Sequence, residues 1–296
     1  MKLRRTVWVL LLLSTIVITI LVVLSTGEGD PMPEIHSYPH KVLEEPLSTL
    51  RVMTLNIAHG RKKGPHQLFQ TSSSIKRNLR GIAAVIQREN VHIAALQEAD
   101  RPSFWSGGFD HVAFLANEVG FAFAAHGKHV NLKWHAYGTA ILSRLPFINP
   151  LSVKLPSSWI VPSKGIVRCG VCGLKGLDSQ VDIYSIHLDP THPAVRRKQV
   201  DILIETIRES HHPVIIMGDF NCSGKKISSA LKRLISGLQL QAHQPDNREL
   251  ITYPRFRRRL DWILISPTLR FIDYHVLPDI LSDHLGVVAE IGVCKD

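Results

Sequence analysis

Short, almost entirely apolar segments recur along this chain of 296 residues and alternate with amphipathic ones. The clearest apolar segments are 51–57, 92–97, 166–174, 181–187 and 214–217. A strand without a polar face must be covered on both sides, whereas an amphipathic helix needs cover on only one. The alternation therefore predicts an α/β-type layered domain with helices outside β-sheets.

The remaining elements follow from the same periodicities. Helices are expected at 75–89, 109–119, 195–209 and 227–235, and further strands at 121–125, 138–143, 260–265 and 287–291. The sequence contains neither GxGxxG nor GxxxxGK[ST], and this excludes dinucleotide-binding and P-loop proteins.

Residues 7–24 form a separate apolar run of 18 residues without a charge. As a helix the run measures about 27 Å, close to the ~30 Å hydrocarbon core of a bilayer. Three basic residues precede it, so we expect a single-pass membrane anchor with residues 1–6 cytoplasmic and the main domain periplasmic or extracellular. The alternative is a signal peptide, whose cleavage would leave a secreted protein.

Residues 25–49 contain four prolines and little periodicity, which predicts an extended tether. The main domain is then expected to span residues 50–296.

The formal net charge of +10 belongs almost entirely to the main domain. Basic clusters follow or precede site strands at Arg61–Lys63, Lys225–Lys226 and Arg255–Arg259. Such clusters can attract an anionic partner such as nucleic acid or lipid phosphate, or they can form a solvated rim. With 45% apolar residues and only four cysteines, the chain is neither disordered nor a disulfide-stapled miniprotein.

Polar residues suited to metal and phosphate chemistry stand at one end of the apolar strands. They are Asn56, Glu98, His187, Asp219, Asn221, Asp261, Asp283 and His284. A buried carboxylate is costly unless it meets a cation or a hydrogen-bond donor. Several such residues at separate strand ends therefore predict one shared active site.

These residues lie in short motifs that occur in a fixed order. The motifs are LN (55–56), LQE (96–98), GTAILSR (138–144), IHL (186–188), GDFN (218–221), RLDWIL (259–264) and SDH (282–284). The ordered set resembles the endonuclease/exonuclease/phosphatase superfamily, which has the DNase I-like fold. The resemblance covers nearly all of residues 50–293. It implies a four-layer sandwich of two stacked mixed β-sheets flanked by helices.

The resemblance also implies a phosphoester hydrolase that uses a divalent metal and an activated water. Glu98 would be the main ligand of Mg²⁺, with Asn56 beside it, Asp283 as a contributor and Mn²⁺ as a possible substitute. Carboxylate oxygens suit such hard cations, which neutralise the phosphate charge that repels a nucleophile.

The same resemblance assigns catalytic roles. Asp219 would orient and deprotonate the water, and Asn221 would hold the nucleophile or a phosphate oxygen. His187 and His284 would donate to the phosphate. Asp261 would hydrogen-bond His284 and favour its cationic form.

Four further residues are weaker candidates for substrate contacts, namely Tyr137, Arg168, Arg257 and Arg258. Packing would explain Tyr137 equally well, and a surface ion pair would explain Arg168.

The substrate is expected to be nucleic acid outside the cytoplasm. The alternative is a phospholipid or sphingolipid headgroup, which would suit a membrane anchor. The motif SDH is followed by Leu285 and Gly286, where relatives often have Arg-Pro or Tyr-Pro, and this leaves the substrate class open. An inactive membrane-tethered binding protein is disfavoured because the full polar set is present. No protein partner is predicted.

The remaining cysteines and histidines have a simpler explanation. Cys169 and Cys172 have CxxC spacing but no second pair, so neither a zinc site nor a redox site is expected. Cys222 is expected to pack in the core. His126, His129, His211 and His212 are expected in solvated turns.

Overall fold

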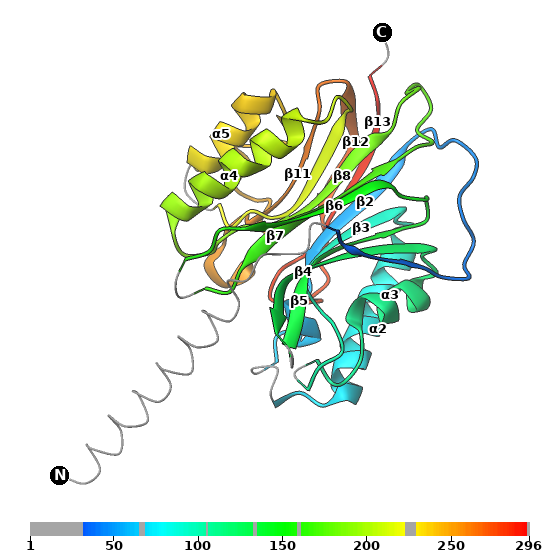
Figure 1. Cartoon of the computed structure of the whole chain (residues 1–296), viewed down its shortest axis with the longest axis vertical. Coiled ribbons are helices and arrows are strands. Elements are labelled where there is room, and N and C mark those ends of the chain that lie inside the picture. The colour runs from blue at the N-terminus through cyan, green and yellow to red at the C-terminus, as the bar shows by residue number, and fades with distance from the viewer. Residues whose placement is uncertain are drawn as a thin grey trace, which may run out of the picture.

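The computed structural model describes residues 32–64, 69–104, 106–132, 135–158, 161–222 and 229–294. Two stacked β-sheets form the centre of the molecule, and helices cover their outer faces (Figure 1). Helices α2 (Ser72–Arg88) and α3 (His111–Val119) pack on one sheet, and α4 (Pro193–Arg208) and α5 (Ser229–Leu238) pack on the other. The expected four-layer sandwich is confirmed.

The first sheet contains seven of the described strands. Their order is β1 (Glu34–Ser37), β4 (Phe123–Leu132), β5 (His135–Ser143), β3 (Ile93–Asp100), β2 (Leu50–Asn56), β13 (Val287–Val293) and β12 (Leu269–Val276). Only β2 and β3 run parallel in this sheet, so the sheet is mixed.

The second sheet contains six of the described strands. Their order is β10 (Gln241–Ala242), β11 (Asp261–Ile265), β9 (Val214–Asp219), β8 (Val181–His187), β7 (Lys164–Val171) and β6 (Ile148–Leu155). Here β8 and β9 are the parallel pair, with His187 opposite Asp219.

The parallel pairs decide where the site lies. The carboxyl ends of β2 and β3 meet at one edge of their sheet, and those of β8 and β9 meet at the matching edge of the other. We call this end of the sandwich, where the four parallel strands finish, the site edge. It carries Asn56, Glu98, His187 and Asp219 at the ends of these four strands.

A short polar chain joins the two sheets just below the site edge. Gln97 on β3 donates to Thr54 on β2 and to Ser185 on β8, in each case over 3.3 Å. All three side chains are fully buried. Because an unmade hydrogen bond here would be costly, the chain fixes the two halves of the site relative to each other. Below it lies an apolar layer that includes Val52, Ile141, Ile183, Ile215 and Ile263.

The four expected helices are present, with ends shifted by a few residues. The side chains of Thr71 and Asp110 cap α2 and α3, and Gly120 ends α3 in the left-handed conformation. Strands β6 and β12, which lie at the outer edges of the two sheets, were not expected from the sequence.

Part of the segment expected to be a tether lies in the first sheet of the domain. Glu34 begins strand β1, and its carboxylate binds Lys128 and Arg101 at 2.8 and 2.9 Å. Leu43 and Leu47 pack against the core between the sheets. These charged and apolar side chains hold the segment on the domain.

The expected cytoplasmic flank and membrane anchor, residues 1–6 and 7–24, lie outside the described residues. Among the residues that the structure describes, no helix is both long and apolar enough to cross a bilayer.

The expectation of solvated turns is wrong for His126 and His129. Both side chains are buried in β4, which continues well past residue 125. His129 donates to or accepts from Thr139 at 3.0 Å, and His126 contacts the carbonyl oxygen of Ala99 at 3.1 Å. Burial lowers the pKa of His126 to about 4 and that of His129 to about 3.

Candidate active site

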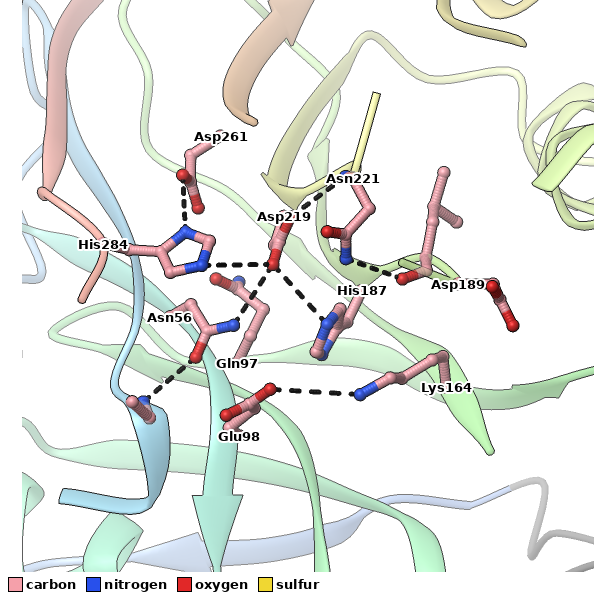
Figure 2. A network of polar contacts seen from close by, with 12 residues as sticks. Asn56, Gln97, Glu98, Lys164, His187, Asp189, Asp219, Asn221, Asp261 and His284 are labelled. Carbon is pink, nitrogen blue, oxygen red and sulfur yellow. Dashed lines mark hydrogen bonds and ion pairs between the residues drawn. The ribbon is translucent and has the colours of Figure 1, made fainter. Parts of the chain in front are cut away.

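Asp219 lies at the centre of the polar residues on the site edge (Figure 2). Its Oδ2 accepts a hydrogen bond from Asn56 Nδ2 at 3.2 Å and lies 3.5 Å from His187 Nε2 and 3.8 Å from His284 Nε2. Its Oδ1 accepts the backbone N–H of Asn221 at 2.9 Å. One carboxylate therefore links both sheets and four of the predicted site residues.

The environment of Asp219 gives it an unusual acidity. Burial raises its pKa to about 7, and the nearby Asp261 adds to the rise, although the charge of His284 and the hydrogen bond from Asn56 oppose it. A carboxylate with a pKa near neutrality is suited to take a proton at physiological pH.

His284 forms a buried pair with Asp261. Its Nδ1 donates to Asp261 Oδ2 at 2.8 Å, and this is the hydrogen bond expected from the sequence. Burial alone would lower the pKa of His284, but Asp261 and Asp219 outweigh it and raise the pKa to about 10. The ring is therefore cationic at neutral pH, with Nε2 directed at Asp219.

His187 has the opposite electrostatic character. Burial and the nearby Lys164 hold its pKa well below the usual range, so its ring is neutral. The site thus has one cationic and one neutral histidine, both facing the same carboxylate oxygen.

The backbone after β9 explains why GDFN places two functional residues side by side. A Cβ at Gly218 would lie 2.0 Å from the carbonyl oxygen of Ile186 on β8, so only glycine allows this pairing. Asn221 has a positive φ of 49°, and its Nδ2 donates to the carbonyl oxygen of Leu188 at 2.9 Å. These contacts turn the Asn221 side chain back over the end of β8.

Glu98 reaches the site through a β-bulge. The pairing of β3 with β5 shifts between Leu96 and Ala99, and Glu98 has a φ of +53°. Bulges re-aim side chains, and here the bulge points the Glu98 carboxylate toward the cleft rather than along the sheet.

Two basic side chains face the Glu98 carboxylate. Its Oε2 lies 3.4 Å from His59 Nε2, and its Oε1 lies 4.0 Å from Lys164 Nζ. Burial alone would raise the pKa of Glu98, but these cations hold the pKa well below its usual range. Asp100 in turn binds His59 Nδ1 at 2.8 Å and raises the pKa of His59 against the effect of burial.

Glu98, His187, Asp219 and His284 are among the residues that line one open cleft of about 310 Å³. The structure brings together all eight predicted strand-end residues except Asp261, which lies behind His284, and adds Arg258 at the rim. Asp283 lines the cleft as well, but its carboxylate binds Arg61 at 2.8 Å.

Three weaker candidates do not line the cleft. Tyr137 is buried against the rings of His59 and His135. Arg168 binds Asp182 at 3.4 Å and the carbonyl oxygen of Asn149 at 2.8 Å, so the ion-pair explanation applies to it. Arg257 lies in the exposed loop before β11, next to Arg258.

The donor set fits a hard divalent cation at Glu98. Its carboxylate is ionised and reaches the cleft, and Asn56 Oδ1 beside it accepts only the backbone N–H of Ala58 among the described residues. Asp219, Asp261 and His284 also offer atoms within 4.8 Å of one another, a geometry that could hold a metal. A cationic His284 has no free lone pair, so this second group is better suited to proton and anion chemistry.

Several residues in or next to the cleft were not predicted from the sequence. Lys164 begins β7 and is buried, which is rare for a lysine. His59 does not line the cleft but contacts Glu98 from the loop after Asn56. Tyr253 and Phe256 line the cleft next to the expected arginines, and the ring of Tyr253 lies 4.8 Å from that of His284.

Residues 53–284 match the sequence pattern of the endonuclease/exonuclease/phosphatase family, over more than half of the chain. The chain belongs to this family. Endonucleases, exonucleases and phosphatases all hydrolyse phosphoester bonds, so this family member is placed among phosphoester hydrolases. No curated protein sequence is significantly similar to it.

Solved structures of the same fold include three that differ in origin. An endonuclease/exonuclease/phosphatase from Beutenbergia cavernae is 22% identical, with a TM-score of 0.63 over 83% of this chain and 72% of its own. The mannosyl-6-phosphatase Bt3783 of Bacteroides thetaiotaomicron is 16% identical, with a TM-score of 0.60 over 82% and 99%. The catalytic domain of human Nocturnin, solved with a bound sulfate anion, is 17% identical, with a TM-score of 0.60 over 90% and 99%. The chain therefore has the same fold as these three proteins.

Proposed function

We propose that this family member is a metal-dependent phosphoester hydrolase that attacks phosphorus with a water activated by Asp219. The observation that carries the proposal is the position of Asp219 Oδ2, which meets Asn56, His187 and His284 in the cleft. A pKa of about 7 lets this carboxylate accept a proton from water near neutral pH.

Glu98 and Asn56 would hold the metal, for which we propose Mg²⁺ with Mn²⁺ as a substitute. Such a cation supplies charge neutralisation at the phosphoryl oxygens. Asp283 is better placed to hold Arg61 at the rim, since its carboxylate already binds that guanidinium.

The two histidines would stabilise the charge that grows on the phosphoryl group. His284 is cationic and held in one tautomer by Asp261, so it can donate Nε2–H to a phosphate oxygen. His187 is neutral and can donate a second hydrogen bond to a phosphate oxygen. Asn221 stands beside Asp219 and would orient the water or a phosphate oxygen.

For the substrate, we propose a phosphodiester outside the cytoplasm, with nucleic acid as the first candidate. The net charge of +10 and the exposed Arg258 in the cleft lining support an anionic substrate, as does the exposed Arg255 beside Phe256. A phospholipid or sphingolipid headgroup is the second candidate, favoured by the exposed ring of Phe256 at the mouth of the cleft.

The purified full chain with Mg²⁺ should be assayed in parallel on plasmid DNA, RNA, sphingomyelin and phosphatidylinositol phosphates. Asp219→Asn is the test variant, because it keeps the shape and removes the base. We expect hydrolysis of at least one substrate class, lost in the variant and in EDTA. Absence of hydrolysis in every arm, or full activity of Asp219→Asn, would refute the proposal.

A further inference from the structure

Exposed large apolar side chains gather in the loops of the site edge. They are Phe104 at 83%, Phe69 at 77% and Phe256 at 58% exposed. Phe104 follows β3, Phe69 follows β2 and Phe256 precedes β11. In the described loops of the opposite edge, no large apolar side chain is exposed to this degree. The asymmetry indicates a contact surface on the site edge.

Basic side chains lie in two of the same loops. Lys62 and Lys63 are exposed in the loop before Phe69, and Arg255, Arg257 and Arg258 are exposed around Phe256. The guanidinium groups of Arg255 and Arg258 lie 5.4 and 5.6 Å from the centre of the Phe256 ring. The surface is therefore apolar and positively charged at once.

The direction of strand β1 shows where the preceding chain enters. Glu34 pairs with His126, toward the site edge, and Ser37 pairs with Phe123 at the opposite edge. Going back from Ser37 to Glu34, the chain thus runs toward the site edge. Its ion pairs with Arg101 and Lys128 hold Glu34 there, and Met32 beyond it is 56% exposed.

Only nine residues, 25–33, separate this point from the apolar run 7–24. Fully extended, they span about 30 Å. We propose that the site edge lies on the lipid bilayer in which residues 7–24 are anchored, with the cleft opening toward the headgroups. The inference goes beyond the proposed chemistry, because it concerns the partner surface and the orientation of the domain.

The chemistry of the surface favours a bilayer over nucleic acid. Apolar side chains that enter the headgroup region and basic side chains that face anionic lipids together produce interfacial binding. A nucleic acid would use the arginines and could stack on Phe256, but it offers no matching contact to the aliphatic side chain of Met32. The spread of apolar residues over several loops matches a flat partner.

The test places a fluorophore on either edge of the full chain. Cys172→Ser and Cys294→Ser remove the exposed thiols, and Phe104→Cys, Phe69→Cys or His211→Cys then adds one labelling site. His211 is exposed on the opposite edge and serves as the matched control. Each protein is reconstituted into vesicles of equal parts phosphatidylcholine and phosphatidylglycerol, and its thermal melting is compared with that of the parent.

We expect spin-labelled lipids to quench most of the emission at positions 104 and 69 and to leave position 211 bright. Aqueous iodide should give the reverse pattern. Equal iodide access at all three positions, or shielding at 104 and 69 without quenching by lipid, would overturn the proposal. So would protection of both labels by single-stranded DNA in detergent. None of these readouts needs catalysis. A failure of the proposed hydrolase activity can therefore be distinguished from a failure of the proposed membrane orientation.

Discussion

The imidazole of His284 donates its Nδ1 proton to Asp261 Oδ2 over 2.8 Å, and both side chains are buried. The pair keeps a positive charge beside Asp219, whose own pKa is raised by burial. The two carboxylates and one ring therefore form a single electrostatic unit rather than three independent groups.

Because the three groups act together, the loss of activity in a double variant should be smaller than the product of the losses in the two single variants. His284→Ala should reduce the rate by about 10²–10⁴-fold, the usual scale for a positioned acid–base or electrostatic group. Asp261→Asn keeps the shape and removes the charge that favours the cationic ring. Once His284 is absent, Asp261 should matter little, so the double variant should resemble His284→Ala. Multiplicative losses, with unchanged thermal unfolding, would show that Asp261 acts elsewhere.

The rate should depend on pH with two limbs. Asp219 must lose its proton to act as a base, so kcat/KM should rise with pH through about 7. It should fall again near pH 10 as His284 loses its charge. His284→Gln should remove the alkaline limb and move the acid limb to higher pH, because Asp219 loses a cationic neighbour. The measurement is a pH profile on a soluble phosphodiester, and an acid limb that shifts when Mn²⁺ replaces Mg²⁺ would instead indicate a metal-bound water.

Metal binding should depend on Glu98. EDTA should abolish activity, and Mg²⁺ or Mn²⁺ should restore it. Glu98→Gln removes the charge, and since loss of a residue that merely orients a ligand costs about 10–100-fold, this change should weaken Mn²⁺ binding by about 100-fold or more. Titration calorimetry with Mn²⁺ measures the affinity directly. Glu118→Gln, in an exposed ion pair with Arg80, is the control and should bind Mn²⁺ as the parent does.

The buried histidines of β4 should make the domain sensitive to acid. The folded-state pKa values of His126 and His129, about 4 and 3, lie below the ordinary value near 6.5. The unfolded chain therefore takes up protons first, and their contribution to stability is present above pH ~6.5 and lost as pH falls toward 3. Near pH 5 each contributes roughly 2 kcal/mol to this loss.

Urea unfolding at several pH values would measure this dependence. His129→Gln should flatten the fall of the unfolding free energy between pH ~6.5 and 4, whereas His211→Gln on the exposed loop should leave it unchanged. An unaltered slope in His129→Gln would assign acid sensitivity to the carboxylates.

Two glycine substitutions should have opposite effects on stability. Gly218→Ala would force a Cβ to 2.0 Å from the carbonyl oxygen of Ile186, so β8 and β9 would have to separate. We expect a loss of more than about 3 kcal/mol in the free energy of unfolding. Gly81 lies inside α2 with no atom within 4 Å of an added Cβ, and Gly81→Ala should add about 0.5–1 kcal/mol. Thermal denaturation of both variants tests the contrast.

Much of the fold could be predicted because its central strands are continuously apolar. Segments such as 181–187 and 214–217 stand out, and the motifs that end them place His187 and Asp219. The edge strands were missed for the opposite reason. β6 and β12 mix apolar with charged and polar residues, since one side of an edge strand meets water.

The sequence predicted which residues form the site but not which of them contact one another. Sequence order cannot show that Arg61 binds Asp283, because 222 positions separate them. Nor can it show that Lys164 reaches Glu98, since that contact depends on how two sheets stack. His126 and His129 were misplaced because a polar ring in sequence suggests solvent, whereas glycines 127, 138 and 165 leave room for His129 inside the sandwich.

The bulge at Glu98 means that β3 carries one residue more than regular pairing with β5 can use. Deleting Glu98 alone would restore an unbroken ladder, remove a positive φ and keep the buried hydrogen bonds of Gln97. The shortened strand should pair better and fold more stably, but the protein should be inactive. Catalysis thus depends on one extra residue in β3 that regular sheet pairing does not need. A library of one-residue deletions should therefore contain a variant that is more stable than the parent and inactive.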